Sequence, residues 1–244
     1  MRFLKAIKQA VASREKMLAV LIDPDKFDPN LSADFLRKLP KNTTHILIGG
    51  STDANGRTET CVKTVKAETS LPVILFPGDH THITAAADAI LFLSLLSGRN
   101  PEYLIGQQIK SVGKLRNSNL EIIPTGYILI DGGKESAVQR VSGTSPISQQ
   151  DPNLIIDTAL TGKFSGKKLI YLEAGSGALQ PVHPEIISAV KTAVQIPVIV
   201  GGGIRTLRQL EKAYAAGADM VVVGTAFEKG EFFSLKNKAT IQDF

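Results

Sequence analysis

Two stretches near the end of the chain decide the fold: Pro197–Gly203, with the sequence PVIVGGG, and Met220–Thr225, with the sequence MVVVGT. Each is a continuous apolar run that ends in glycine, without the polar alternation of a half-exposed strand. Strands that are apolar at every position are typical of parallel sheets, in which both faces are buried. The two stretches therefore predict parallel strands with glycine-rich carboxyl ends.

Six similar runs precede these two. They are Met17–Ile22, His45–Ile48, Val73–Phe76, Ala89–Leu95, Tyr127–Ile130 (with Glu121–Ile123 just before it) and Leu169–Leu172. Helical patterns lie between most of the runs, most clearly at Ala33–Leu39, Glu102–Leu115, Pro152–Thr161, Pro184–Val194 and Leu207–Ala216. Eight strand–helix units in 244 residues predict an α/β fold, a modified (β/α)8 or TIM barrel. Because no linker-like stretch divides the chain, we expect one domain over residues 1–244.

Three segments depart from the regular pattern. Only about a dozen residues separate Phe76 from Ala89, so we expect helix three to be replaced by a loop, which would leave a groove in the barrel wall. The long stretch 132–150 predicts an active-site loop with a short extended segment. Phe3, Ile7 and Val11 share one helical face, which predicts a helix that plugs the bottom of the barrel, with a membrane-surface anchor as the alternative.

Composition argues against several classes of protein. The net charge is +5, but the chain has no tryptophan and its aromatic residues (6%) do not interleave with basic ones, which disfavours nucleic-acid binding. Positive charge better suits small anionic substrates or an anionic membrane surface. The single cysteine, Cys61, excludes an intramolecular disulfide and a cysteine-based zinc cluster. We expect a cytoplasmic protein that touches the membrane surface at most transiently.

Glycine-rich turns follow the last two strands, at Gly201–Arg205 and Gly224–Thr225. Backbone N–H groups in such turns can approach phosphate oxygens because no Cβ intervenes. Phosphate sites in these barrels are frequently built from the loops after strands seven and eight. The turns therefore predict a phosphate site, the alternative being that the glycines only make tight turns.

The sixth strand ends in Tyr171–Gly177, with the sequence YLEAGSG. Tyr171 and Glu173 are two residues apart, so their side chains are expected to point together into the barrel mouth. The Glu173 carboxylate there could hold the hydroxyl groups of a small polyol phosphate, or accept a proton from one of them. The alternative is a structural carboxylate buried against Arg or Lys.

Oxygen donors close the first two strands. Asp23, in the sequence DPDK, ends the first strand, and Ser51, in GGS, ends the second. Such hard ligands suit Mg²⁺, which usually adds substrate phosphates and water to one or two carboxylates. The alternative for Asp23 is a turn or cap. A metal site here would bind a second phosphorylated group, opposite the glycine-rich phosphate turns. The two sites together indicate two phosphorylated substrates.

Four other polar residues are candidates for the barrel mouth. His80 and His82 lack the spacing of a zinc site. Arg99 and Lys134 are candidates for a diphosphate or for solvated surface.

Taken together, the motifs resemble the geranylgeranylglyceryl phosphate synthase family. The matching segments, in the family's order, are Leu21–Lys26, Gly49–Ser51, Ser97–Pro101, Pro124–Tyr127, Tyr171–Gly177, Gly201–Arg205 and Gly224–Thr225. The resemblance implies a barrel with helix three replaced by a loop. It also implies a prenyltransferase that joins sn-glycerol 1-phosphate to geranylgeranyl diphosphate through an ether bond and releases diphosphate, with Mg²⁺ as cofactor.

The resemblance also implies roles for individual residues. Glu173 and Tyr171 would be catalytic, Glu173 taking the proton of the attacking hydroxyl, while Asp23 and Ser51 would hold Mg²⁺. The prenyl chain would lie where helix three is missing, and the protein would be a homo-oligomer, a dimer or larger. The residues implied for sn-glycerol 1-phosphate are Tyr171, Leu172, Glu173, Ala174, Gly175, Ser176, Gly177, Gly202, Gly203, Gly224 and Thr225.

Other functions stay open at this stage. One branch of the family takes heptaprenyl chains, although the segment Asn100–Gln107 and the chain length resemble the geranylgeranyl branch more closely. Another possibility is a different phosphate-binding barrel enzyme, such as a sugar-phosphate epimerase or isomerase. The last is a binder of a phosphorylated ligand that catalyses nothing.

Overall fold

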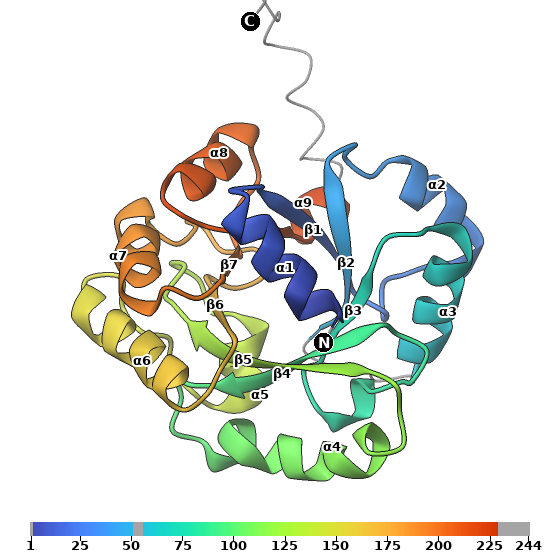
Figure 1. The fold of residues 1–244 in the computed structure, drawn as a ribbon, viewed down its shortest axis with the longest axis horizontal. Helices are drawn as coiled ribbons and strands as arrows, with labels where there is room; N and C mark the ends of the chain where they lie inside the picture. The colour runs from blue at the N-terminus through green and yellow to red at the C-terminus, as the bar shows by residue number, and fades with distance from the viewer. Residues whose placement is uncertain (1, 51–55, 229–244) are drawn as a thin grey trace, which may run out of the picture.

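A computed structural model describes residues 2–50 and 56–228 and shows eight parallel strands closed into a barrel in sequence order (Figure 1). The strands are β1 (Met17–Ile22), β2 (Thr43–Gly49), β3 (Val73–Phe76), β4 (Ala89–Leu95), β5 (Glu121–Leu129), β6 (Leu169–Glu173), β7 (Val198–Gly201) and β8 (Met220–Val223). Met17 of β1 pairs with Met220 of β8, which closes the barrel. The predicted barrel is confirmed, with the two runs at 121–123 and 127–130 joined into one strand, β5.

Alternate residues of each strand face opposite sides of the barrel wall. Ala19, Leu47 and Leu91 belong to a buried cluster inside the barrel. Their neighbours Val20 and Ile90 belong to the clusters that pack under the helices. Burial on both faces is the reason these strands have no polar alternation.

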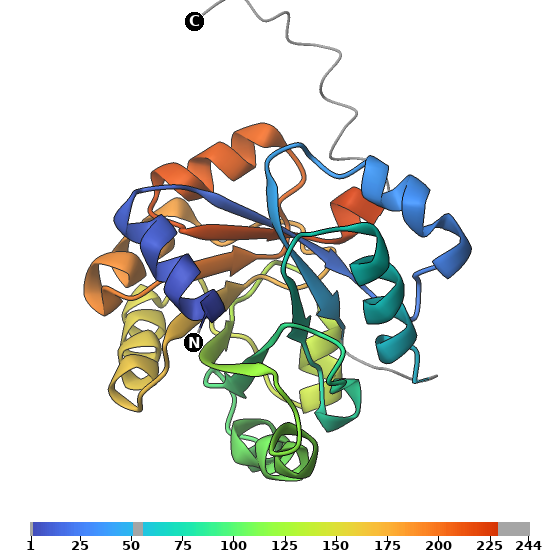
Figure 2. The same ribbon diagram turned by 45° about the vertical axis from the view of Figure 1, so that its right-hand side comes forward.

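The helices lie outside the barrel (Figures 1 and 2). They include α2 (Ser32–Arg37), α3 (Thr58–Glu68), α4 (Gln107–Leu115), α6 (Pro152–Phe164), α7 (Pro184–Val194), α8 (Leu207–Ala215) and the short α9 (Thr225–Glu228). A 3-10 turn, η1 (Pro29–Leu31), precedes α2, and a π-helical turn, η3 (Glu102–Gly106), precedes α4. Helix α3 was not among the clearest sequence patterns. Its buried side chains Cys61, Val62 and Val65 are interspersed with Thr and Lys, which weakens the apolar periodicity.

The connection between β3 and β4 contains no α-helix. The predicted loss of the helix after the third strand is therefore confirmed. The helix labelled α3 is a different one, since it follows β2. All residues between β3 and β4 are described, and the only regular element there is a 3-10 turn, η2 (His80–His82). Asp79 caps this turn, because its carboxylate accepts the N–H of Thr81 at 2.7 Å.

The segment 132–150 differs from the prediction, because it contains a helix, α5 (Ala137–Ser142). The Ser136 hydroxyl caps α5 by accepting the N–H of Gln139 at 3.1 Å. Six residues are too few to give a readable helical period, so the sequence indicated only a loop. The expected extended segment is reduced to one parallel bridge between Ile130 and Ile147.

Helix α1 (Arg2–Ala12) crosses the end of the barrel that faces the viewer in Figure 1. Leu4 and Ile7 are buried against the interior cluster, which confirms the predicted plug. The Glu121 carboxylate, at the start of β5, accepts the N–H groups of Phe3 at 2.7 Å and Leu4 at 2.9 Å. It therefore caps α1 across more than a hundred residues of sequence. None of the described helices has the length and apolar character needed to span a membrane.

The cap predicts a measurable contribution to stability. In Glu121→Ala, the first N–H groups of α1 lose their acceptor, so the free energy of unfolding should fall by about 1 kcal/mol. The melting temperature should fall by roughly 2–4 °C, measured by thermal unfolding. Glu15→Ala, which removes an exposed glutamate near the other end of α1, is the control. Equal effects of the two variants would contradict the capping role.

Candidate active site

A cavity of about 340 Å³ opens at the carboxyl ends of the strands. The ends of all eight strands, or the loops that follow them, contribute to its lining. It joins three kinds of surface: glycine-rich turns, a pair of inward-facing polar side chains from β6, and an apolar groove in the barrel wall.

The glycine-rich turns lie together on one side of the cavity, lined by Ser176, Gly177, Gly202, Gly203, Gly224 and Thr225. Gly202 has a φ of +81°, and a Cβ there would lie 2.5 Å from Glu173 Oε1 and 2.6 Å from the nitrogen of Gly175. Only glycine can occupy this position without displacing the neighbouring chain. The Ser176 and Thr225 hydroxyl oxygens are 2.9 Å apart, which joins the β6 and β8 loops.

Several N–H groups of these turns are available to a ligand. Within the described chain, the N–H groups of Ser176, Gly177, Gly202 and Gly203 have no protein acceptor. Unpaired N–H donors gathered in a concave turn are a recurrent anion-binding arrangement. By contrast, Leu172 and Ala174 pack in the cluster outside the barrel and do not line the cavity, so only their backbone groups are near it.

Glu173 and Tyr171 both face the cavity, as their spacing predicted. Glu173 Oε1 accepts the N–H of Gly175 at 2.7 Å. Burial raises the pKa of Glu173 to about 7, although the Gly175 N–H and the adjacent Tyr171 hydroxyl both favour the ionised form. Among the described residues no Lys or Arg pairs with Glu173, so the structure does not support the alternative of a carboxylate buried against a cation.

Three aromatic rings form the floor beneath these groups. The ring centroids of Phe76 and Tyr171 are 5.2 Å apart, and those of Tyr127 and Tyr171 are 5.3 Å apart. The Tyr171 hydroxyl is fully buried without a hydrogen bond of regular geometry. The sequence reading assigned no role to Phe76 or Tyr127. Their inward position on β3 and β5 is the signal that could have found them.

Asp23 lies at the end of β1, which pairs with β8. The expectation that it lies opposite the glycine-rich turns is therefore wrong: a Cβ on Gly224 would lie 3.5 Å from Leu21 Cβ of β1. Asp23 Oδ1 accepts the N–H of Asp25 at 3.1 Å, and its Oδ2 pairs with Lys26 Nζ at 2.8 Å, so it is partly a turn residue. Its side chain still lines the cavity and is 24% exposed. Ser51 lies outside the described residues.

The donors at Asp23 suit one kind of metal site. Among the described residues no cluster of three or more His, Cys, Asp or Glu side chains could hold a metal ion. One open carboxylate fits Mg²⁺, which takes most of its ligands from substrate phosphates and water.

The groove runs from the mouth along the outer face of β4, where the third helix of the barrel is missing. Ile83, Ile90 and Phe92 give it an apolar wall. Tyr103 of η3 and Ser111 of α4 line the opposite side. The missing helix thus leaves a groove in the barrel wall that is lined by side chains, as expected.

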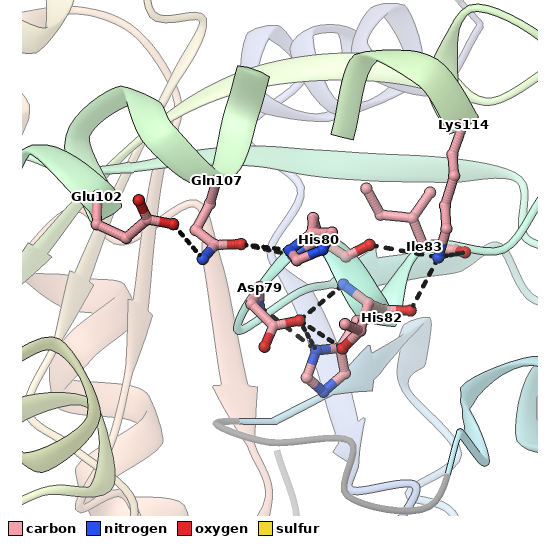
Figure 3. A network of polar contacts seen from close by, with 8 residues as sticks. Asp79, His80, His82, Ile83, Glu102, Gln107 and Lys114 are labelled. Carbon is pink, nitrogen blue, oxygen red and sulfur yellow. Dashed lines mark hydrogen bonds and ion pairs between the residues drawn. The ribbon is translucent and has the colours of Figure 1, made fainter. Parts of the chain in front are cut away.

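A polar network fastens the η2 loop to η3 and α4 (Figure 3). Gln107 Oε1 lies 2.9 Å from both the backbone nitrogen and Nδ1 of His80, and Gln107 Nε2 donates to Glu102 at 2.7 Å. Lys114 donates to backbone carbonyls of the same loop. The network replaces the packing that a third helix would have supplied.

The remaining polar candidates divide by position. Asp79 and His80 line the cavity. Arg99 and Lys134 are absent from its lining: Arg99 donates to the carbonyls of Leu96 and Gly98, and Lys134 is exposed.

Known proteins resemble this chain over most of its length. Residues 11–241 match the PcrB family. A geranylgeranylglyceryl phosphate synthase of Zunongwangia profunda is 59% identical over 95% of this chain and 99% of that protein. One from Thermococcus kodakarensis is 44% identical over 88% of this chain and 86% of that protein. A crystal structure of (S)-3-O-geranylgeranylglyceryl phosphate synthase from Thermoplasma acidophilum in complex with sn-glycerol-1-phosphate has a TM-score of 0.87 and 37% identity, covering 93% of this chain and 91% of that one.

The raised pKa of Glu173 predicts how stability depends on pH. The folded protein keeps this proton up to about pH 7, whereas the unfolded chain loses it near 4.5. The resulting stabilisation is complete below pH 4.5 and is lost as the pH rises through 7. Between pH 4 and 8, the unfolding free energy of the wild type should therefore fall by up to about 3 kcal/mol relative to Glu173→Gln, which cannot ionise. Urea denaturation at each pH measures the free energy of unfolding. Parallel pH profiles for the wild type and Glu173→Gln would contradict the shifted pKa. The exposed Glu185→Gln is the control.

Proposed function

The chain belongs to the PcrB family and has geranylgeranylglyceryl phosphate synthase activity, and we propose how its cavity performs this prenyl transfer. The substrates are sn-glycerol 1-phosphate and geranylgeranyl diphosphate. One observation carries the proposal: unpaired N–H donors, a buried carboxylate, an open carboxylate and an apolar groove all meet in a single cavity.

In this proposal the glycine-rich turns hold the phosphate of sn-glycerol 1-phosphate. The N–H groups of Ser176, Gly177, Gly202 and Gly203 donate to its oxygens, and Gly224 and Thr225 complete the wall. The glycerol hydroxyls then lie toward Tyr171 and Glu173, which line the same cavity. Leu172, Ala174 and Gly175 contribute only through the backbone of the loop.

Glu173 acts on the attacking hydroxyl. The hydroxyl oxygen forms a bond with C1 of the prenyl chain while the bond from C1 to the diphosphate oxygen breaks, and the electron pair leaves with diphosphate. The hydroxyl proton passes to Glu173, whose pKa of about 7 suits a group that must accept and later release it near neutral pH. An allylic diphosphate ionises readily, so orientation and charge stabilisation matter more than base strength.

The open side of the mouth receives the diphosphate. We propose that Asp23 would hold Mg²⁺ there, where the ion would supply charge neutralisation for the departing diphosphate. Ser51, the second expected ligand, lies outside the described residues. The geranylgeranyl chain then lies along the groove against Ile83, Ile90 and Phe92. The length of the groove determines which prenyl diphosphate fits.

We also propose that the protein is a homo-oligomer. Ile105, Ile109 and Val112 form an exposed apolar stripe along η3 and α4, with 55%, 65% and 46% of their surfaces accessible. A stripe at this helical spacing fits a second copy of the chain better than it fits water.

The activity is tested directly by incubating the purified protein with geranylgeranyl diphosphate, radiolabelled sn-glycerol 1-phosphate and Mg²⁺. Label should appear in the extracted lipid phase. Efficient transfer only with a heptaprenyl diphosphate would reassign the chain length, and label in the lipid phase with neither substrate would refute the proposal.

The two anion sites should respond separately to mutation. Asp23→Ala should lower Mg²⁺-dependent turnover by about a hundredfold or more, because the diphosphate loses its counter-charge. Binding of sn-glycerol 1-phosphate, measured by calorimetry, should change little. Equal loss of binding and turnover would mean that Asp23 has a structural role. Asp34→Ala, at an exposed pair with Arg37, is the control.

The stripe on α4 makes a prediction about assembly. Ile109→Lys should shift the protein toward the monomer in light scattering coupled to size exclusion, because it places a charge inside an apolar contact. Asp157→Lys, which introduces the same charge at an exposed position of α6, is the control. A mass unchanged by Ile109→Lys would place the contact elsewhere.

A further inference from the structure

Arg205 is a cavity-lining side chain that the reaction scheme above leaves without a role. Its Nη2 donates to two successive carbonyl oxygens in the loop after β6, that of Gly177 at 3.2 Å and that of Ala178 at 2.6 Å. The side chain therefore bridges from the loop after β7 to the loop after β6.

The backbone of Arg205 is fixed independently of its side chain. Gln209 Oε1 accepts the N–H groups of Arg205 at 2.9 Å and Thr206 at 3.1 Å, within the capping box that begins α8. The backbone of Arg205 is thus held by the start of α8, and its guanidinium is held by two carbonyl oxygens. Such a side chain is a rigid brace.

The loop that Arg205 reaches needs a brace. The N–H of Ala178 donates to the carbonyl of Gly175 at 3.1 Å, which closes a four-residue turn. Gly177 has a φ of +72° and Gly175 a φ of +100°, conformations that glycine adopts easily but does not enforce. The two central residues of this turn, Ser176 and Gly177, carry N–H groups proposed to bind phosphate. Because Arg205 fixes the carbonyls at the end of the turn, it also fixes where those N–H groups point.

Charge supports the same role. An arginine side chain stays protonated at all relevant pH values. Within the described chain Arg205 forms no ion pair with a carboxylate, and its guanidinium donates to neutral carbonyl oxygens. Its positive charge is therefore not cancelled at the edge of the cavity, next to the turn.

We propose that Arg205 is the positioning residue for the phosphate of sn-glycerol 1-phosphate: it holds the Gly175–Ala178 turn in its binding shape and adds a positive charge beside it. This inference rests on the proposed function. It assigns Arg205 to one substrate and gives it no part in binding the prenyl diphosphate.

Two variants separate the brace from the charge. Arg205→Met removes both, and we expect KM for sn-glycerol 1-phosphate to rise about tenfold to a hundredfold. Arg205→Lys keeps the charge but loses the planar fork that spans two carbonyls, so its KM should lie between those of the wild type and Arg205→Met. The value of kcat and KM for geranylgeranyl diphosphate should stay near wild type. Arg208→Met, on the exposed side of α8, is the control.

A merely structural role gives a different pattern. It would lower the melting temperature and change kcat and both KM values together, and that result would overturn the proposal. An unchanged KM for sn-glycerol 1-phosphate in Arg205→Met would also overturn it. Full recovery in Arg205→Lys would refute the brace and leave only the charge.

Binding of inorganic phosphate, followed by calorimetry, tests the site without turnover. The wild type should bind phosphate, and Arg205→Met should bind it at least tenfold more weakly. Equal binding would refute the role of Arg205 and leave the proposed function standing if the wild type still transfers label to lipid. Phosphate binding lost in Arg205→Met, with no label transfer by the wild type, would support the anion site and refute the prenyl transfer. A wild type that binds no phosphate would refute the Arg205 proposal outright.

Discussion

Closure of the eight strands is the constraint on which the rest of the structure depends. A closed parallel barrel buries both faces of every strand, so side chains such as Leu47 and Leu91 must be apolar inside, and Val20 and Ile90 must be apolar outside. Polar chemistry can then occur only where a strand ends and its backbone leaves the sheet. Glu173 follows this rule, since it is an ionisable group at the last position of β6, where the barrel begins to open.

The missing third helix is the second consequence of this arrangement. In a regular barrel a helix would cover the outer face of β4, and Ile90 and Phe92 would pack against it. Here a 3-10 turn replaces that helix and the two side chains line a cavity instead. Without a helix, apolar packing alone cannot keep the loop between β3 and β4 in place against the barrel wall. The hydrogen bonds from His80 to Gln107 and from Gln107 to Glu102 fasten the loop to η3 and α4 instead.

The sequence was sufficient where one physical rule acts alone. Continuous apolar runs located all eight strands, and the two-residue spacing of Tyr171 and Glu173 placed both side chains inside the mouth. It was insufficient where tertiary contacts decide. The helix α5 depends on a Ser136 cap and six residues, and the burial that shifts the Glu173 pKa exists only after the strands close. Arg205 bonds to Gly177 and Ala178, which precede it by 28 and 27 residues, and no local sequence pattern indicates contacts at that separation.

In the proposed reaction the cavity would bind its two anionic substrates by different means, and the difference suits the chemistry between them. The phosphate of sn-glycerol 1-phosphate would meet the neutral N–H groups of the glycine-rich turns, with the Arg205 guanidinium beside one of these turns. The leaving group would instead lie near the Asp23 carboxylate, which attracts a cation rather than the anion itself. Glu173 lines the same cavity with a pKa of about 7, because burial opposes its charge and no Lys or Arg in the described chain cancels it. A cation in contact with Glu173 would lower that pKa and weaken the carboxylate as a proton acceptor. Arg205 makes no such contact, because its guanidinium bonds the carbonyl oxygens of Gly177 and Ala178 instead.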